Sequence, residues 1–193
     1  MIYRFPRAAR LAAGLLISLV LGTVAPPVGW ADQTDPRLDR LFGELQRTTG
    51  DREIAILEAA IWRIWLETGS ATVDLLMQRG LDGMAAAEYD QAEAAFTKVT
   101  ELAPDFAEAW NKRATVRYLA GEYEGAISDV ERTLELEPRH FGALSGLAMV
   151  HHEMGDDVAA LAAIRRTLEV HPHLEAMIAL EEKLTLQIEG RGI

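Results

Sequence analysis

The sequence predicts an all-α solenoid, a stack of helical hairpins, because several features recur at one fixed interval. A proline recurs at Pro104, Pro138 and Pro172. Twelve positions before each proline stands an alanine, and eight positions before each stands a large apolar residue. A fixed period of this length indicates a repeat protein, in which each unit packs against its neighbours. The units span residues 73–106, 107–140 and 141–174.

Each unit contains two helical patterns separated by a turn. In the second unit, Trp110, Ala114 and Tyr118 are spaced four positions apart and form one stripe of a helix. Gly121 favours the end of that helix, and the apolar residues of 123–136 predict a second helix. Small residues recur where the two helices would cross closely. They are Gly80, Ala114 and Ala148 in the first helices and Ala92, Ala126 and Ala160 in the second.

The second unit can be written as one spaced motif. It runs Trp110-x2-Arg113-Ala114-x2-Arg117, then Ala126-x3-Val130, then Pro138. This pattern resembles the tetratricopeptide repeat, whose motif is W-x2-L-G-x2-Y, then A-x3-F, then P. The units on either side agree with it in phase. Arg113 replaces the usual leucine, and we expect its stem to lie over the paired helix and its guanidinium to meet Asp129.

Two further segments flank the repeats. Residues 32–72 predict a divergent N-terminal hairpin, with apolar stripes before and after a break near Gly50. Gly50 lies farther from Ala87, the equivalent turn position, than one repeat length, so this hairpin is three positions out of register. Residues 175–193 predict a final amphipathic helix and a tail. We expect both segments to cap the solenoid, and a separate binding role is the alternative.

Residues 1–31 predict a secretory signal peptide. Three arginines precede an apolar run over 11–24, and Gly29-Trp30-Ala31 places small residues where cleavage after Ala31 requires them. The expected location is therefore periplasmic or secreted, with no integral membrane domain after cleavage. Retention of the segment as a membrane anchor is the alternative.

The charge of the chain restricts its partners. The formal net charge is −11, and cleavage after Ala31 would remove three arginines and no acidic side chain, which lowers it to −14. A polyanion of this kind repels nucleic acid and anionic membrane surfaces, so neither is an expected partner. The chain has no cysteine, which excludes thiol catalysis and disulfide chemistry.

Sequence motifs for catalysis are missing, so we predict no enzyme, no catalytic residue and no cofactor. The histidines are the candidates for metal ligands. His151 and His152 are adjacent and point about 100° apart on a helix, whereas metal pairs on helices use i, i+4 spacing. His171 and His173 flank Pro172 in a turn. We therefore predict no metal site, and a metal-binding protein that uses these four histidines is the weakest alternative.

The resemblance implies where a partner would bind. In tetratricopeptide repeats the first helix of each unit lines a concave groove, through the second, fifth, ninth and twelfth residues of the unit. Asp74, Glu108 and Gly142 occupy the second position. The predicted groove residues at the other positions are Met77, Leu81, Met84, Asn111, Thr115, Tyr118, Ser145, Met149 and His152. The alternative is that the apolar members are covered by the N-terminal hairpin or the final helix.

This mixture of flexible apolar and hydrogen-bonding side chains suits an extended or helical peptide. It differs from the chaperone-binding subclass, because Met77 and Leu81 stand where a carboxylate clamp needs polar residues. The predicted function is non-enzymatic binding of a peptide or protein partner in the cell envelope, as an adaptor or assembly factor. The alternative of another class is a structural solenoid that self-associates into a homo-oligomer through its ends.

Overall fold

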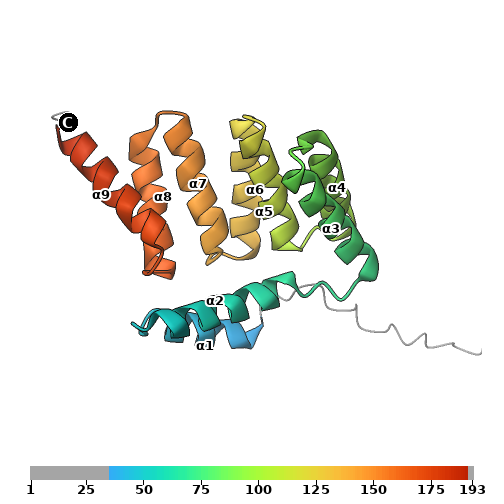
Figure 1. Cartoon of the computed structure of the whole chain (residues 1–193), viewed down its shortest axis with the longest axis horizontal. Coiled ribbons are helices and arrows are strands. Elements are labelled where there is room, and N and C mark those ends of the chain that lie inside the picture. The colour runs from blue at the N-terminus through green and yellow to red at the C-terminus, as the bar shows by residue number, and fades with distance from the viewer. Residues whose placement is uncertain (1–34, 191–193) are drawn as a thin grey trace, which may run out of the picture.

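The computed structural model describes residues 35–190, and within that span the chain forms nine α-helices and no β-strand. The helices are α1 (Pro36–Leu45), α2 (Asp51–Leu66), α3 (Ala71–Ala85), α4 (Tyr89–Leu102), α5 (Ala107–Leu119), α6 (Tyr123–Leu136), α7 (Phe141–Glu153), α8 (Asp157–Val170) and α9 (Glu175–Gly190). Helices α3 to α9 stand side by side in chain order, and each packs against the next (Figure 1). This arrangement confirms the predicted all-α solenoid. The predicted signal peptide and the tail after Gly190 lie outside the described residues.

The turn inside each helical hairpin repeats as the sequence does. Gly121 and Gly155 adopt φ angles of 80° and 78°, in the left-handed region that ends a helix. The equivalent residue of the first hairpin is Ala87, which adopts a φ angle of 56°. A Cβ atom makes this conformation unfavourable by roughly 1 kcal/mol, so the first hairpin keeps the same turn at a small cost.

Arg113 meets Asp129 as the sequence predicts. The guanidinium donates from Nε and Nη2 to the two carboxylate oxygens, at 2.8 and 2.7 Å. Asp129 also accepts a hydrogen bond of 2.9 Å from Arg117, and its side chain is only 2% exposed. Because a buried carboxylate requires such partners, these bonds fix α5 against α6 in one register.

Two neighbouring hydrophobic cores in the repeats differ greatly in size. The first core joins α3, α4 and α5, and it comprises Val73, Met77, Ala92, Phe96, Val99, Ala103, Phe106, Ala109 and Val116. The second core joins α5, α6 and α7, and its buried members are Ala114, Val130 and Ala143. Large aromatic side chains fill the first core, whereas the second is built from small and medium ones.

The N-terminal hairpin does not cap the solenoid in the expected way. Helices α1 and α2 lie across the ends of the repeats, below the turns that join one repeat to the next (Figure 1). Phe141 belongs to the apolar cluster of the hairpin, and Val170 and Leu174 pack against that cluster. The hairpin is out of register with the repeats, and it buries its apolar face against their connecting turns instead of against α3.

Polar contacts fix the hairpin to these turns. Arg139 forms an ion pair of 2.7 Å with Asp39 of α1. His171 lies 2.6 Å from a carboxylate oxygen of Glu58 in α2, and His173 lies 2.9 Å from the carbonyl oxygen of Leu45. Burial lowers the pKa of His171, and the neighbouring carboxylate of Glu58 only partly offsets this effect. Burial therefore favours the neutral form of His171 in the folded protein.

At the other end of the row, α9 packs against α8 (Figure 1). Met177 and Leu184 are buried in the third core, which also contains Leu161 and Ile164 of α8. The side chain of Leu186 points away from this contact and is 71% exposed.

Candidate functional site

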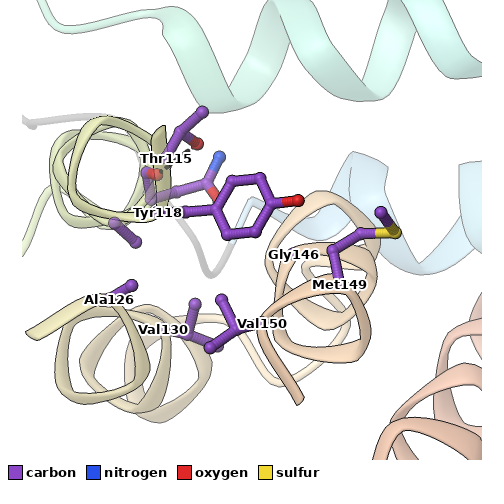
Figure 2. Close-up of a pocket in the computed structure, with 9 residues that line it drawn as sticks. Thr115, Tyr118, Ala126, Val130, Gly146, Met149 and Val150 are labelled. Atoms are coloured by element: carbon purple, nitrogen blue, oxygen red, sulfur yellow. Dashed lines mark hydrogen bonds between the residues drawn. The ribbon is translucent and has the colours of Figure 1, made fainter. Parts of the chain in front are cut away.

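A cavity of about 190 Å³ lies beside the second core, between α5, α6 and α7. Its lining residues are Asn111, Ala114, Thr115, Tyr118, Ala126, Val130, Gly146, Met149 and Val150. In Figure 2, Tyr118 reaches from α5 toward Gly146 and Met149 of α7, while Val130 and Val150 close the opposite wall. We call this space the α5–α7 pocket. It lies between the first helices of two neighbouring repeats, which line the concave face of a solenoid.

Two lining residues are smaller than their equivalents in the other repeats. Val130 stands where Phe96 and Ile164 stand, and Gly146 stands where Gln78 and Lys112 stand. A Cβ atom built on Gly146 would meet nothing within 4 Å. By contrast, a Cβ atom on Gly80 in α3 would lie 2.5 Å from the ring of Phe96. The backbone of α3 therefore packs directly against an aromatic ring, whereas α7 faces open space at Gly146.

Few polar groups line the pocket, and most are already paired. The Thr115 hydroxyl donates to the carbonyl oxygen of Asn111 at 2.9 Å. The Asn111 amide donates to Glu108 at 2.8 Å. Burial raises the pKa of Tyr118, and the negative charge of Glu153 raises it further. The phenol therefore stays protonated at neutral pH and offers a hydrogen-bond donor at the wall of an otherwise apolar space.

Below the pocket, α2 of the hairpin approaches the start of α7. A Cβ atom on Gly142 would lie 2.9 Å from Cη2 of Trp62, so the indole rests on the backbone of α7. The ammonium group of Lys112 lies 5.6 Å from the centre of the Trp62 ring, a distance typical of a cation–π contact. The hairpin thus fills the concave face at Gly142 and leaves it open one helical turn later, at Gly146.

A buried polar cluster supports this contact. His140 stacks on Trp65, with ring centres 4.2 Å apart, and its Nδ1 accepts the N–H of Ala143 at 3.1 Å. Since Nδ1 accepts, Nε2 carries the proton that it donates to Glu108 at 3.0 Å. Burial opposes ionisation of Glu108, but His140 and the charge of Lys112 together hold the pKa of Glu108 below its usual range. The carboxylate is therefore engaged by three neighbouring side chains: Asn111 and His140 at Oε2, and Lys112 at Oε1.

The model of the tetratricopeptide repeat family matches residues 77–134 and 112–175, which together cover more than half of the chain. The chain belongs to the tetratricopeptide repeat family. A TPR repeat-containing protein of Rhizobium etli is 38% identical over 85 residues, which are 44% of this chain. The match spans 42% of the length of that Rhizobium protein.

Solved structures show the same architecture. The TPR domain of Sgt2 from Aspergillus fumigatus superposes with a TM-score of 0.60 at 26% identity, over 64% of this chain and 83% of the domain. The TPR2B domain of yeast Sti1, solved as a complex with pHsp70, gives a TM-score of 0.57 at 20% identity, over 61% of this chain and 99% of that one. The tetratricopeptide fold is typical of protein–protein interaction modules.

The structure brings together some of the groove residues that the family pattern predicts. Asn111, Thr115, Tyr118 and Met149 all line the α5–α7 pocket. Met77 does not, because its side chain is 6% exposed and belongs to the first core. Met84 is partly buried against the same core. Leu81, also on α3, is 36% exposed.

The two polar groove residues on α7 are occupied within the fold. The Ser145 hydroxyl donates to the carbonyl oxygen of Phe141 at 2.7 Å. Nδ1 of His152 lies 2.9 Å from a carboxylate oxygen of Asp157. On α7 the polar side chains of these two groove residues are therefore engaged within the fold, whereas Met149 lines the α5–α7 pocket.

Five lining residues were not among the predicted groove residues: Ala114, Ala126, Val130, Gly146 and Val150. Four of them are core positions of the repeat, and a cavity beside a core depends on the summed volume of three helices. Among these five residues, only Gly146 stands out in the sequence itself. A glycine in the middle of a helix is unfavourable by about 1 kcal/mol relative to alanine, so it often marks a packing or ligand site.

The candidate histidines are divided between α7 and the turn before α9, where the ring centres of His171 and His173 lie 6.1 Å apart. His152 pairs with Asp157, while His171 and His173 contact the N-terminal hairpin. Among residues 35–190, no group of three or more histidine, aspartate or glutamate side chains has the arrangement of a metal site. Over the same span, no helix has the length and apolar character needed to cross a membrane.

Proposed function

We propose that this protein is a non-enzymatic adaptor or assembly factor of the cell envelope, and that it binds a peptide or protein partner in the α5–α7 pocket and along the concave face around it. The observation that carries the proposal is the pocket itself. It is apolar and open, and it lies among four side chains that the family pattern assigns to the groove. Apolar concave sites with a few polar groups are the usual ligand sites of proteins.

The signal peptide predicted over residues 1–31 supports the proposed location in the envelope. Its arginines, apolar run and small residues before the cleavage point fit export, and the strongly acidic remainder disfavours nucleic acid as a partner. Amino-terminal sequencing of the protein from its source tests this step. A first residue of Asp32 is expected, and an intact N-terminus in a membrane fraction would favour a retained anchor.

The binding proposal is tested by affinity capture from an envelope extract of the source organism. The wild type runs beside Met149→Glu, which places a charge in the pocket wall, and beside Met154→Glu as a matched control. Met154 is 46% exposed and does not line the pocket. Circular dichroism must first show that both variants keep the helical content of the wild type.

We expect a partner to be captured by the wild type and by Met154→Glu, and to be lost with Met149→Glu. If all three capture the same proteins, the pocket does not carry the function. In that case the convex face or the ends of the solenoid become the sites to examine.

Self-association is the second candidate, and it is favoured by the exposed face of α9. Leu186 and Ile178 are 71% and 37% exposed there, next to a shallow hollow lined by Glu181, Glu182 and Thr185. Light scattering over a range of concentrations separates the two functions. An adaptor stays monomeric, whereas a structural solenoid grows in mass and is dispersed by Leu186→Glu.

A further inference from the structure

The size of the α5–α7 pocket limits what can enter it. Its volume is about 190 Å³, and its lining is almost entirely apolar. In another protein, an apolar cavity of about 150 Å³ binds benzene. A single aromatic side chain therefore fits the pocket. The ring of Tyr118 lies at its wall, and aromatic pairs are favourable by about 0.5–1.5 kcal/mol beyond the area that they bury.

The chain itself shows that an aromatic group packs well against α7. Gly142 and Gly146 lie four positions apart, so they are neighbours on one side of the helix, about 6 Å apart along its axis. The indole of Trp62 covers Gly142, where a Cβ atom would lie 2.9 Å from it. Nothing covers Gly146. The indole of Trp62 and the empty α5–α7 pocket therefore lie at successive positions along the same face of α7.

The surroundings of the pocket favour a positively charged ligand. Glu153 is exposed one turn beyond Met149 on α7. Burial is the main cause of the raised pKa of Tyr118 at the pocket wall, and the negative charge of Glu153 adds to it. The nearby cations are already neutralised. Lys112 pairs with Glu108 at 2.8 Å, and Arg117 pairs with Glu93 at 2.7 Å. The chain as a whole carries a net charge of −11, so a basic segment is attracted and an acidic one repelled.

We propose that the partner presents a basic segment with one aromatic side chain, and that this side chain enters the α5–α7 pocket next to Trp62. The inference rests on the proposed function and adds the chemistry of the partner to it. The aromatic ring supplies the buried contact at Gly146, and the flanking basic residues face Glu153. The hairpin forms one end of the site, since Trp62 occupies the adjoining position at Gly142.

The test uses three short synthetic peptides of equal length, labelled with fluorescein and titrated with the protein purified from its source. The first alternates lysine and alanine around a central phenylalanine. The second replaces the phenylalanine by serine, and the third replaces every lysine by glutamate. We expect the first peptide to bind at least tenfold more tightly than either of the others in fluorescence anisotropy.

Two variants assign this preference to the pocket. Gly146→Leu fills the cavity and favours the helix, so the fold is retained, and we expect the tenfold preference for phenylalanine over serine to disappear. Ala94→Leu makes the same kind of change at an exposed position of α4 and should leave the preference unchanged. Glu153→Gln should reduce the preference for lysine over glutamate by about two- to fivefold, as expected for one exposed charge.

Equal binding of the phenylalanine and serine peptides would overturn the inference, as would a preference that survives in Gly146→Leu. A chain that dimerises, with a dimer abolished by Gly146→Leu, would also overturn it, because the occupant is then a second copy. The same variant separates this inference from the proposed function. If Gly146→Leu loses the partner captured from extract but the peptides show no preference, only the chemistry proposed here is wrong. If the variant still captures the partner, both proposals fail.

Discussion

The first and second cores of the solenoid are built on the same repeat and are filled to different extents. In the first core, Phe96 and Phe106 are fully buried and Met77 is nearly so. In the second core, the buried residues are Ala114, Val130 and Ala143, and the α5–α7 pocket lies beside them. The first core is thus packed as protein interiors normally are, whereas the second is incomplete on the side of the pocket.

The difference teaches how a repeat protein can acquire a binding site without changing its fold. The repeat period fixes where the helices cross, and it is the same in both cores. What changes is the side-chain volume at positions facing the neighbouring repeat. Val130 in place of Phe96 and Gly146 in place of Gln78 leave the helices where they are, and the α5–α7 pocket lies between them. The first core is therefore the closely packed one, and the second is the one with space for the binding proposed above.

The largest effect is expected for Phe96→Ala. The side chain is completely buried in the first core and contacts the backbone of α3 at Gly80, so its loss should lower the free energy of unfolding by about 3–5 kcal/mol. Urea denaturation followed by circular dichroism measures the change. A loss below about 1 kcal/mol would show that the first core is not closely packed.

A smaller decrease in the free energy of unfolding is expected for Gly80→Ala. The added Cβ atom would lie 2.5 Å from two ring carbons of Phe96, and overpacking of this kind costs about 1–3 kcal/mol. The same denaturation experiment applies. An alanine that is tolerated without loss would mean that α3 and α4 can separate freely, contrary to the close crossing described here.

Gly146→Ala in the second core is expected to stabilise the protein instead of destabilising it. The new methyl group meets nothing within 4 Å, and alanine favours a helix over glycine by about 1 kcal/mol. The free energy of unfolding should therefore rise by about that amount. If the variant is destabilised, the space at Gly146 is closed in solution and the contrast between the cores is lost.

Gly142→Ala tests the boundary between the hairpin and the pocket. The gain in helix propensity is opposed by a contact of 2.9 Å with Trp62, so the net change should stay within about 1 kcal/mol of zero. The tryptophan emission spectrum should nevertheless shift, because the indole has to move. Unchanged emission would indicate that Trp62 does not rest on α7.

The smallest effect concerns pH and the docking of the hairpin. Burial lowers the pKa of His171 below its ordinary value of 6.5, so the unfolded chain binds this proton more readily than the folded one. Stability from this group is present above about pH 6.5 and is lost as the pH falls through the folded pKa. Glu58 and His173 also face this ring, and they act in opposite directions on its pKa.

Unfolding in urea at pH 7.5 and at pH 5.5 checks the effect of His171. The free energy of unfolding should decrease toward pH 5.5 in the wild type and should change less in His171→Asn. His151→Asn serves as the control, because that histidine does not contact the hairpin. At these pH values the contribution of Glu108 is not yet lost, since a carboxyl whose pKa is lowered loses stability only below its ordinary value of 4.5. Identical slopes in all three proteins would contradict a role for His171 in docking.

Regular features of the chain could be predicted from the sequence because they depend on local spacing. The period of the prolines and alanines predicted the hairpins of the solenoid. The positions of Arg113 and Asp129 in the two helices of one repeat predicted the ion pair between α5 and α6. The two helices of the N-terminal hairpin also follow from its apolar stripes. Each of these inferences uses residues close in sequence or related by the repeat.

The placement of the hairpin could not be predicted in this way. It depends on residues in the connecting turns, such as Phe141 and His171, that are far from α1 and α2 in sequence. The family pattern indicated Asn111, Thr115, Tyr118 and Met149 but could not show that Met77 is covered by its own core. Whether a groove position is open depends on the volume of side chains from three helices together, which no local pattern contains.

The most direct test of the open second core is a titration of the protein with benzene, followed by NMR of methionine methyl groups labelled with ¹³C. Met149 lines the α5–α7 pocket, whereas Met77 and Met177 are buried in the first and third cores. We expect the methyl signal of Met149 to shift in a saturable way, the other two to remain in place, and Gly146→Leu to abolish the shift. A Met149 signal that does not respond, or equal shifts at all three methionines, would contradict a distinct pocket between α5 and α7.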